Sequence, residues 1–196
     1  MKVDCCTNTV ERVEEKMFEE VTSRTDLEIF NSIWKESFTK ENYELGECEG
    51  PATRYLVKNA EGETNGTVEI IPYSMDKERS TVEDMFLFSS LDMTKKTSLQ
   101  HIYEIDKLSV GKYKKTGTLE NILDVLLYFA KQHNVHYYYA LINPLLFRAL
   151  KITYGFPVKK AGKLIKTDDY IIQPMFIDMQ KTLLTPTWKE KKISQT

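Results

Sequence analysis

The sequence predicts an α/β fold with a mixed central β-sheet, antiparallel at first and parallel across one crossover, flanked by helices. Residues 102–156 carry the main signal, because an apolar strand, a basic turn, an amphipathic helix, a second strand and a second helix follow in the order of a parallel βαβ unit. Residues 53–58 are interpreted as a half-buried strand with alternating side chains, and residues 66–72 return the chain after a turn, which is typical of an antiparallel hairpin. The crossover helix begins beyond the end of its strand, where anions bind readily, and we expect the chemistry there.

The N-terminal part of the chain predicts two helices and a loop. Residues 9–23 space valine and methionine between glutamates in an amphipathic pattern, and Thr25-Asp26-Leu27-Glu28 has the form of a capping box that opens a second helix. Residues 39–52 read as a loop rich in Glu and Gly. Its acids form either a solvated face or a rim around a cationic substrate: Glu41, Glu44, Glu47 and Glu49.

The segments on either side of the crossover are less regular. Residues 85–88 fit a short helix or a buried strand, and periodicity does not decide between them. Residues 89–100 are polar and read as a connection. Residues 158–166 and 170–178 flank an aspartate-containing turn and predict a closing hairpin.

Length and charge restrict the class of protein. The chain of 196 residues predicts one domain spanning 1–196, with flexible ends at 1–8 and 182–196. Its net charge of −2 and its pI near 6.0 disfavour a nucleic-acid partner, which would require a strongly basic face. No apolar run approaches the roughly 20 residues that cross a bilayer, so we expect no membrane span.

The three cysteines disfavour both a disulfide framework and a metal site. Their number is odd, Cys5 and Cys6 are adjacent, and the pair has no zinc-type spacing to Cys48. The N-terminus becomes polar at once and lacks the apolar core of a signal peptide. We therefore expect a cytoplasmic protein without a bound metal.

The turn after the first crossover strand is a candidate phosphate site. It combines lysines that attract anions with small residues that allow close approach of a phosphate to the backbone of a helix start. Since most helix N-termini bind nothing, a solvated lysine-rich turn is an open alternative. The residues concerned are Lys112, Lys114, Lys115, Thr116, Gly117 and Thr118.

Glu104 is a carboxylate in an otherwise apolar strand. Burial there is costly unless the charge is paired, and it would raise the pKa toward that of a general base. The alternative is a structural role, either facing water on an edge strand or paired with Lys107. Strict alternation puts the two side chains on opposite faces, so the pairing would need a β-bulge.

Histidines and tyrosines give weaker signals. His101, His133 and His136 are expected to share neither a face nor a ligand spacing. Residues 137–139 are three tyrosines, which we interpret as strand packing with one hydroxyl able to reach a site.

Residues 102–156 resemble the core of the GNAT acyltransferase superfamily, in which a glutamate-bearing strand leads into a pyrophosphate-binding turn. The motif of that turn, Gln/Arg-x-x-Gly-x-Gly/Ala, is similar to residues 114–119, where the last residue is leucine instead. Asn143 and Tyr154-Gly155-Phe156 resemble the superfamily's second-strand asparagine and closing Gly-Phe. The position of the superfamily's usual tyrosine acid is Lys151 here.

Residues 30–180 also resemble the acyl-homoserine-lactone synthases and the related long-chain N-acyl amino acid synthases. Their Glu-x-x-Arg strand is similar to residues 104–107, with Lys107 for Arg, and their Gly-x-x-Arg-Leu-Leu-Pro is similar to residues 66–72, with Glu69 for Arg. Glu44 and Glu47 are the nearest counterparts of the paired aspartates of lactone synthases. These departures disfavour a homoserine-lactone product and leave the acyl-transfer fold intact.

The resemblance implies transfer of an acyl group from a coenzyme A or acyl-carrier-protein thioester to a small-molecule amine. Glu104, Lys107 and Tyr154 are the catalytic candidates, with Glu104 taking the amine's proton directly or through water. Two alternatives are a catalytically silent acyl-CoA-binding or regulatory module and an interaction domain without a ligand. The residues that would bind the cofactor are Leu108, Ser109 and Val110 along the pantetheine arm, Lys112, Lys114, Lys115, Thr116, Gly117 and Thr118 at the phosphates, and Asn143.

We expect an acyl chain longer than acetyl. Residues 85–88 and 137–139 are apolar or aromatic and could line a tunnel between the two crossover strands. The alternative is that these side chains only fill the core.

Overall fold

The computed structural model describes residues 16–38, 50–111, 117–168 and 170–184. Three groups of residues named above therefore lie outside the described residues: the cysteines, the acids of the loop 39–49 and the lysines of the turn 112–116.

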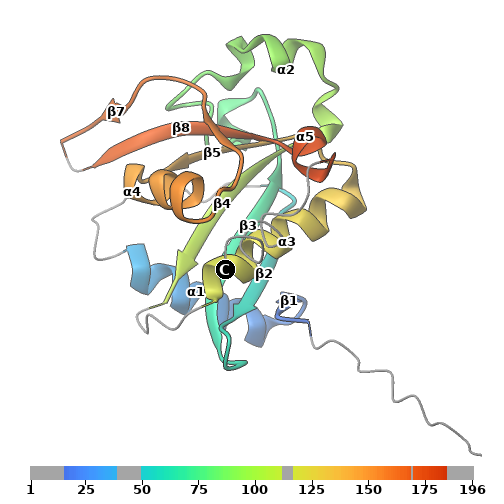
Figure 1. The fold of residues 1–196 in the computed structure, drawn as a ribbon, viewed down its shortest axis with the longest axis vertical. Helices are drawn as coiled ribbons and strands as arrows, with labels where there is room; N and C mark the ends of the chain where they lie inside the picture. Colours follow the sequence, from blue (N-terminus) through green and yellow to red (C-terminus); the bar gives the residue numbers. More distant parts are fainter. Residues whose placement is uncertain (1–15, 39–49, 112–116, 169, 185–196) are drawn as a thin grey trace, which may run out of the picture.

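One mixed sheet organises the described chain, as the sequence predicted (Figure 1). The strands lie in the order β1-β2-β3-β4-β5-β8-β6, and β7 pairs with β8 at the side. Only β4 and β5, the two strands of the crossover, pair in parallel. The strands are β1 (Phe18–Glu20), β2 (Thr53–Lys58), β3 (Thr64–Pro72), β4 (Ile102–Val110), β5 (Tyr137–Ile142), β6 (Val158–Lys160), β7 (Ile165–Lys166) and β8 (Ile171–Asp178).

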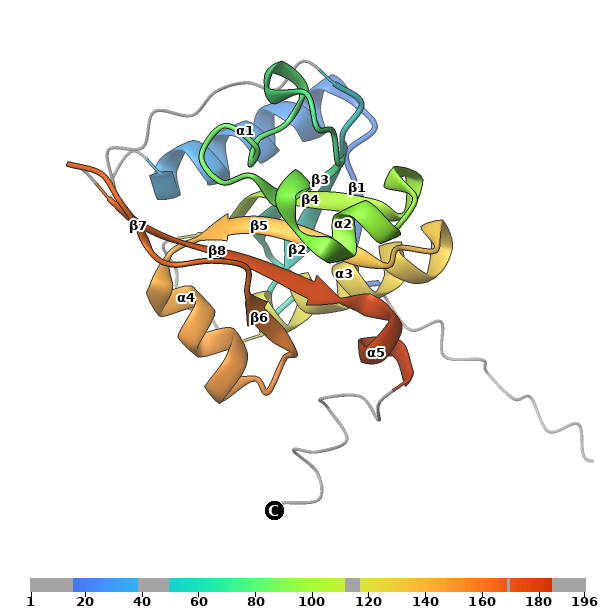
Figure 2. The same ribbon diagram turned by 90° about the horizontal axis from the view of Figure 1, so that it is seen from above.

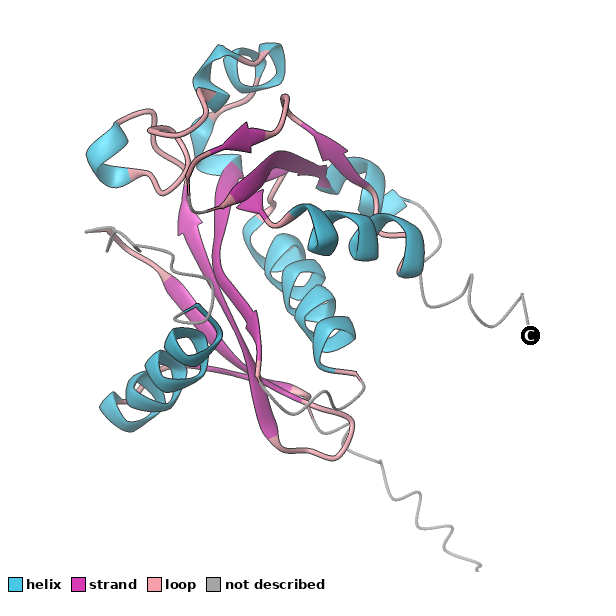
Figure 3. Ribbon diagram, turned by 90° about the vertical axis from the view of Figure 1, so that its left-hand side faces the viewer, coloured by secondary structure: helices cyan, strands magenta, loops and turns pink. Residues whose placement is uncertain are grey.

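Helices cover both faces of the sheet (Figure 2). Helix α1 and residues 73–101, which we call the covering segment, lie on one face, and α3 and α4 lie on the other (Figures 2 and 3). The covering segment contains α2 and three short 3-10 turns. The helices are α1 (Arg24–Phe38), α2 (Asp92–Lys96), α3 (Thr118–His133), α4 (Pro144–Arg148), which continues as a π-helical turn (Ala149–Thr153), and α5 (Met179–Leu184).

The hydrophobic core has two main parts, one on each face of the sheet. On the α3 face, buried strand residues such as Val68, Ile70 and Ile105 pack on the apolar stripe of α3. Under the covering segment, the Phe88 and Tyr139 rings stack with their centroids 4.5 Å apart. The two faces therefore differ, because the α3 face is apolar whereas the other also holds buried charged groups.

The N-terminal prediction was partly wrong. Within the predicted helix 9–23, Phe18–Glu20 forms strand β1, which pairs antiparallel with β2, because backbone pairing to a distant strand overrides a local helical pattern. The second helix is confirmed, but its cap is Ser23. The Ser23 hydroxyl accepts from the Asp26 N–H at 3.1 Å, and the Asp26 carboxylate accepts from the Ser23 N–H at 3.1 Å.

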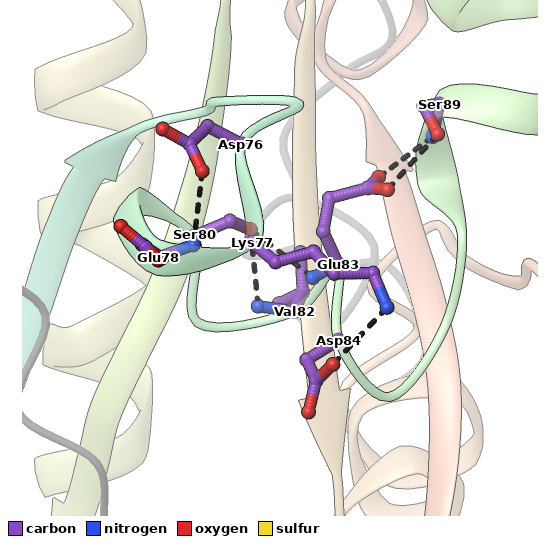
Figure 4. A network of polar contacts seen from close by, with 8 residues as sticks. All are labelled: Asp76, Lys77, Glu78, Ser80, Val82, Glu83, Asp84 and Ser89. Carbon is purple, nitrogen blue, oxygen red and sulfur yellow. Dashed lines mark hydrogen bonds and ion pairs between the residues drawn. The ribbon is translucent and has the colours of Figure 1, made fainter.

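Residues 85–88 form neither the short helix nor the buried strand that the sequence allowed. They belong to a series of turns in the covering segment, and Phe88 begins the 3-10 turn Phe88–Ser90. Figure 4 shows how polar contacts hold it: the Ser80 hydroxyl accepts from the N–H groups of Val82 and Glu83, as a helix cap does, although no helix follows. The buried Glu83 carboxylate accepts from the N–H and hydroxyl of Ser89 at 2.7 and 2.9 Å.

Candidate active site

Strands β4 and β5 pair over only part of their length. The parallel register ends at Glu104 and Tyr139, although β4 continues to Val110 and β5 to Ile142. Figure 1 shows the two strands separating toward their carboxyl ends. Residues 105–110 and 140–142 therefore lack a pairing partner across this strand gap, and their facing N–H and C=O groups can bind an extended ligand.

A β-bulge lies at the start of the strand gap. Thr67 pairs with Ser109 and Glu69 with Asp106, so two residues of β4 oppose one residue of β3. Lys107 adopts a positive φ of 45°, which is unusual for a residue with a side chain. The Thr67 hydroxyl donates to the Lys107 carbonyl at 2.8 Å and fixes the bulge.

The bulge turns the Lys107 side chain toward the charged face of the sheet. Its Nζ lies 2.7 Å from Glu69 Oε2 and 5.4 Å from the centre of the Trp34 ring. The second oxygen of Glu69 is paired with the Arg54 guanidinium at 2.5 Å. The bulge anticipated from the sequence is present, but it pairs Lys107 with Glu69 and not with Glu104.

Glu104 is fully buried, with 0% of its surface exposed. Its Oε1 accepts from the Ser80 hydroxyl at 2.7 Å, and its Oε2 accepts from the N–H and the hydroxyl of Thr81 at 2.7 and 2.6 Å. Burial raises its pKa, and these hydrogen bonds oppose the rise. Glu104 thus ties the covering segment to β4, an arrangement that neither structural alternative from the sequence described.

Asp106 was missed by the sequence reading. Ile105 packs into the core on the α3 face, so alternation puts Asp106 on the same face as Glu104. The side chain is half-buried, and burial raises its pKa, with the charge of Glu69 acting in the same direction. The signal that could have found it is the second carboxylate two residues after Glu104 in the same strand.

The end of β4 and the start of α3 are joined through Asn65. The Gly111 N–H donates to the Asn65 carbonyl at 2.7 Å, and the Asn65 amide donates to the Thr118 hydroxyl at 3.3 Å. Gly117 is the N-cap of α3 with φ of 96°, and a Cβ there would lie 3.2 Å from the Ala60 side chain. Glycine provides no capping side chain, so among the described residues no side chain accepts from the first N–H groups of α3.

The remaining residues predicted to bind the cofactor lie along or beside the strand gap. Leu108 packs against the core, the Ser109 hydroxyl lies 2.7 Å from that of Thr67, and Val110 is 37% exposed. Asn143 follows β5 at the same end of the sheet, where its side-chain oxygen accepts from the Leu145 N–H at 2.8 Å and caps α4.

Tyr154 lies on the α3 side of the sheet, partly buried against the main core. Burial raises its pKa, as does the charge of Glu120 in the first turn of α3, so the hydroxyl remains protonated at neutral pH. Glu104 and Lys107 face the opposite side of the sheet. Of the three catalytic candidates, the structure thus brings two to one face and places Tyr154 on the other.

One further expectation from the sequence, which concerns the histidines, can be compared with the structure. The His101 and His136 rings stack with centroids 4.5 Å apart. The expectation that the histidines share no face was therefore wrong, because the parallel register brings Ile102 and Tyr137 side by side.

Among the residues described, no group of three or more His, Cys, Asp or Glu is placed to hold a metal. No helix in the described segments is long and apolar enough to cross a membrane.

Most of the aromatic residues predicted to line an acyl tunnel pack in the part of the core under the covering segment. Phe88 and Tyr139 are fully buried and stacked, and the Tyr139 hydroxyl lies 2.7 Å from that of Thr94. Tyr138 faces the α3 side and donates to the Leu126 carbonyl at 3.0 Å. Phe88, Tyr138 and Tyr139 therefore fill the core, whereas Leu87 is 53% exposed, and the tunnel stays a prediction.

No family model and no curated protein matches the sequence, but solved structures match the fold. FeeM, an N-acyl amino acid synthase from uncultured soil microbes, is 14% identical over 84% of this chain and 92% of its own, with a TM-score of 0.65. BjaI, a CoA-dependent acyl-homoserine lactone synthase solved with SAM and isopentyl-CoA, is 12% identical over 83% of both chains, with a TM-score of 0.63. MesI, another CoA-dependent acyl-homoserine lactone synthase, is 16% identical over 88% of this chain and 91% of its own, with a TM-score of 0.61.

The chain has the fold of these acyl-transferring synthases. The resemblance in sequence pattern predicted this fold, and the structural match extends it to most of the chain.

Proposed function

We propose that this protein is an N-acyltransferase that moves an acyl group from an acyl-CoA or acyl-carrier-protein thioester to an amine. The observation that carries the proposal is the strand gap. Two parallel strands that part after Glu104 and Tyr139 present unpaired backbone groups, as an extended pantetheine arm requires. The same end of the sheet meets the glycine-capped N-terminus of α3, which suits phosphates.

The cofactor would lie along β4. Leu108, Ser109 and Val110 would face the pantetheine arm, and the N–H groups at the start of α3, together with the lysines of the preceding turn, would hold the phosphates. Asn143 at the end of β5 would border the other side of the arm. A coenzyme A thioester supplies an activated acyl group and a thiolate leaving group, so the protein itself needs no covalent nucleophile.

The chain's own groups would position the acceptor amine and handle its proton. Glu104 is a candidate proton acceptor, directly or through water, provided that one of its three hydrogen bonds is exchanged. Lys107, whose ammonium group is paired with Glu69, would fix the position of the charged side chains on this face of the site. Tyr154, kept protonated, is a candidate donor to the departing thiolate, and backbone N–H groups in the strand gap would stabilise the developing oxyanion.

The comparisons support this proposal through what the matched proteins do. FeeM is an N-acyl amino acid synthase, and BjaI and MesI are CoA-dependent acyl-homoserine lactone synthases. All three join an acyl group to an amine in a fold of this kind. Glu69 in place of Arg and Lys107 in place of Arg argue that the acceptor here differs from that of the lactone synthases.

A series of thioesters tests the proposal and separates it from a silent acyl-CoA-binding module. Thermal stabilisation by acetyl- to dodecanoyl-CoA at equal concentration should increase with chain length, since each buried methylene contributes about 0.8 kcal/mol. Thiol release that depends on added amine marks an enzyme. Stabilisation without amine-dependent release identifies the silent module, and no stabilisation by any thioester, carrier-protein thioesters included, contradicts the proposal.

A further inference from the structure

Asp106 occupies a distinctive position on the charged face of the sheet. It pairs across the ladder with Glu69 of β3 and follows Glu104 by two residues, so it is the first side chain on this face after β4 and β5 part. The side chain is half-buried and thus retains access to a ligand. Asp106 therefore lies at the start of the strand gap, next to the last paired residues of β4 and β5, where the thioester carbonyl of the proposed reaction would meet the acceptor amine.

Among the described residues, the neighbouring basic side chains form no ion pair with Asp106. Arg54 and Lys107 are both bound to Glu69, at 2.5 and 2.7 Å. Within the described part of the chain, no basic side chain lies within 4.0 Å of the Asp106 carboxylate. The adjacent Lys107 N–H and the Lys107 charge offset only part of the cost of burial.

This arrangement has no structural benefit that the described contacts reveal. Two carboxylates directly opposite one another on neighbouring strands destabilise a sheet, and partial burial adds to the cost. Glu104 differs, because its hydrogen bonds to Ser80 and Thr81 hold the covering segment in place. Groups that cost stability without a packing role are typical of functional sites.

We propose that Asp106 binds the ammonium group of the acceptor amine and removes its proton during acyl transfer. The inference rests on the proposed function and assigns its proton acceptor. The ammonium would supply the positive charge that Asp106 lacks. Once the Asp106 carboxylate has taken a proton, the nitrogen lone pair forms the C–N bond, the C–S bond breaks, and the sulfur leaves with its bonding electrons. As the tetrahedral intermediate collapses, the nitrogen gives its second proton to water, and the thiolate takes one proton from Tyr154, the candidate donor, which regains it from water.

The test compares Asp106→Asn with the parent in two measurements. Thermal stabilisation by a long-chain acyl-CoA reports thioester binding, and amine-dependent thiol release reports the reaction over a range of amine concentrations. Asp106→Asn should bind the thioester as the parent does, should lower kcat by about 10²-fold or more, as loss of a general base does, and should raise the KM for the amine. Asp84→Asn, which removes an exposed carboxylate paired with Lys77, is the matched control and should leave all three quantities unchanged.

Two outcomes separate this inference from the proposed function. If the parent transfers acyl groups and Asp106→Asn does so with unchanged kcat and KM, Asp106 is not the proton acceptor although the function stands. If the parent neither binds thioester nor releases thiol, the function fails and the inference with it. A loss of activity in Asp106→Asn that is accompanied by a lowered melting temperature and lost thioester binding would show a structural role and overturn the inference.

Discussion

Glu104 and Asp106 stand two residues apart on one face of β4, yet their surroundings give them opposite effects on stability. Glu104 receives three hydrogen bonds from Ser80 and Thr81, whereas Asp106 faces Glu69 without an ion pair among the described residues. The first carboxylate therefore holds the fold together and the second weakens it. This contrast gives a prediction that needs no knowledge of the substrate.

At neutral pH, Glu104→Gln should lower the melting temperature and Asp106→Asn should raise it. In glutamine an NH2 group, which cannot accept, replaces one of the two carboxylate oxygens, so the donors of either Ser80 or Thr81 lose their acceptor, and an unsatisfied buried donor costs about 1–3 kcal/mol. Burial raises the pKa of Asp106, so the folded state favours the protonated carboxyl. Protonation of Asp106 therefore contributes fully to the free energy of unfolding below pH 3.8, and this contribution is lost as the pH rises through the raised pKa of the folded state. The gain of Asp106→Asn should therefore shrink in acid. Equal melting temperatures for both variants and the parent would contradict both claims, that the hydrogen bonds of Glu104 stabilise the fold and that the charge of Asp106 destabilises it.

The sequence predicted Glu104 as a special residue but not its partners. Ser80 and Thr81 lie more than 20 residues earlier in a segment without periodicity, and hydroxyl donors leave no charge pattern to detect. The sequence alone does not distinguish Asp106, because only the register between β3 and β4 shows that it lies opposite Glu69. From the sequence one could say only that a pair between Glu104 and Lys107 would need a β-bulge. The register between β3 and β4 is what shows that a bulge is present.

At the scale of elements, the crossover and the hairpin were predictable because their patterns are strong and local. Strands β2 and β3 are short apolar stretches joined by a turn, and β4, α3 and β5 follow a standard βαβ order. Strand β1 was not predictable, since its three residues owe their conformation to pairing with β2. The covering segment lacks a period and is fixed by buried polar contacts and aromatic stacking, which a local pattern does not show.

The junction between β4 and α3 supplies a prediction about cofactor binding. Gly117 has φ of 96° and lies close to Ala60, so Gly117→Val should displace the helix start and weaken coenzyme A binding at least tenfold, which is about 1.4 kcal/mol. Gly62→Val is the control, because Gly62 has a similar φ of 83° and nothing within 4 Å of an added Cβ. Titration calorimetry measures both affinities. Unchanged affinity in Gly117→Val would place the phosphates elsewhere.

For the whole molecule, the fold separates an apolar face, which carries the core under α3, from a charged face under α1 and the covering segment. The strand gap is an opening in the sheet itself and is therefore accessible from both faces. A thioester lying in the gap would have Asp106 on the charged face and Tyr154 on the apolar face. The sequence pattern of residues 102–156 predicted the parallel crossover, whereas the division into an apolar and a charged face and the position where the strands part required the structure.

Hydrogen–deuterium exchange with and without acyl-CoA tests the central claim most directly. The account predicts that a bound thioester slows exchange at residues 105–110 of β4 and at the start of α3, because the backbone groups of β4 that face the strand gap have no strand partner there and no side chain of the described residues caps α3. The paired strand β2 should be unaffected and serves as the internal control. Protection confined to other elements, or none under conditions that saturate binding, would contradict the account.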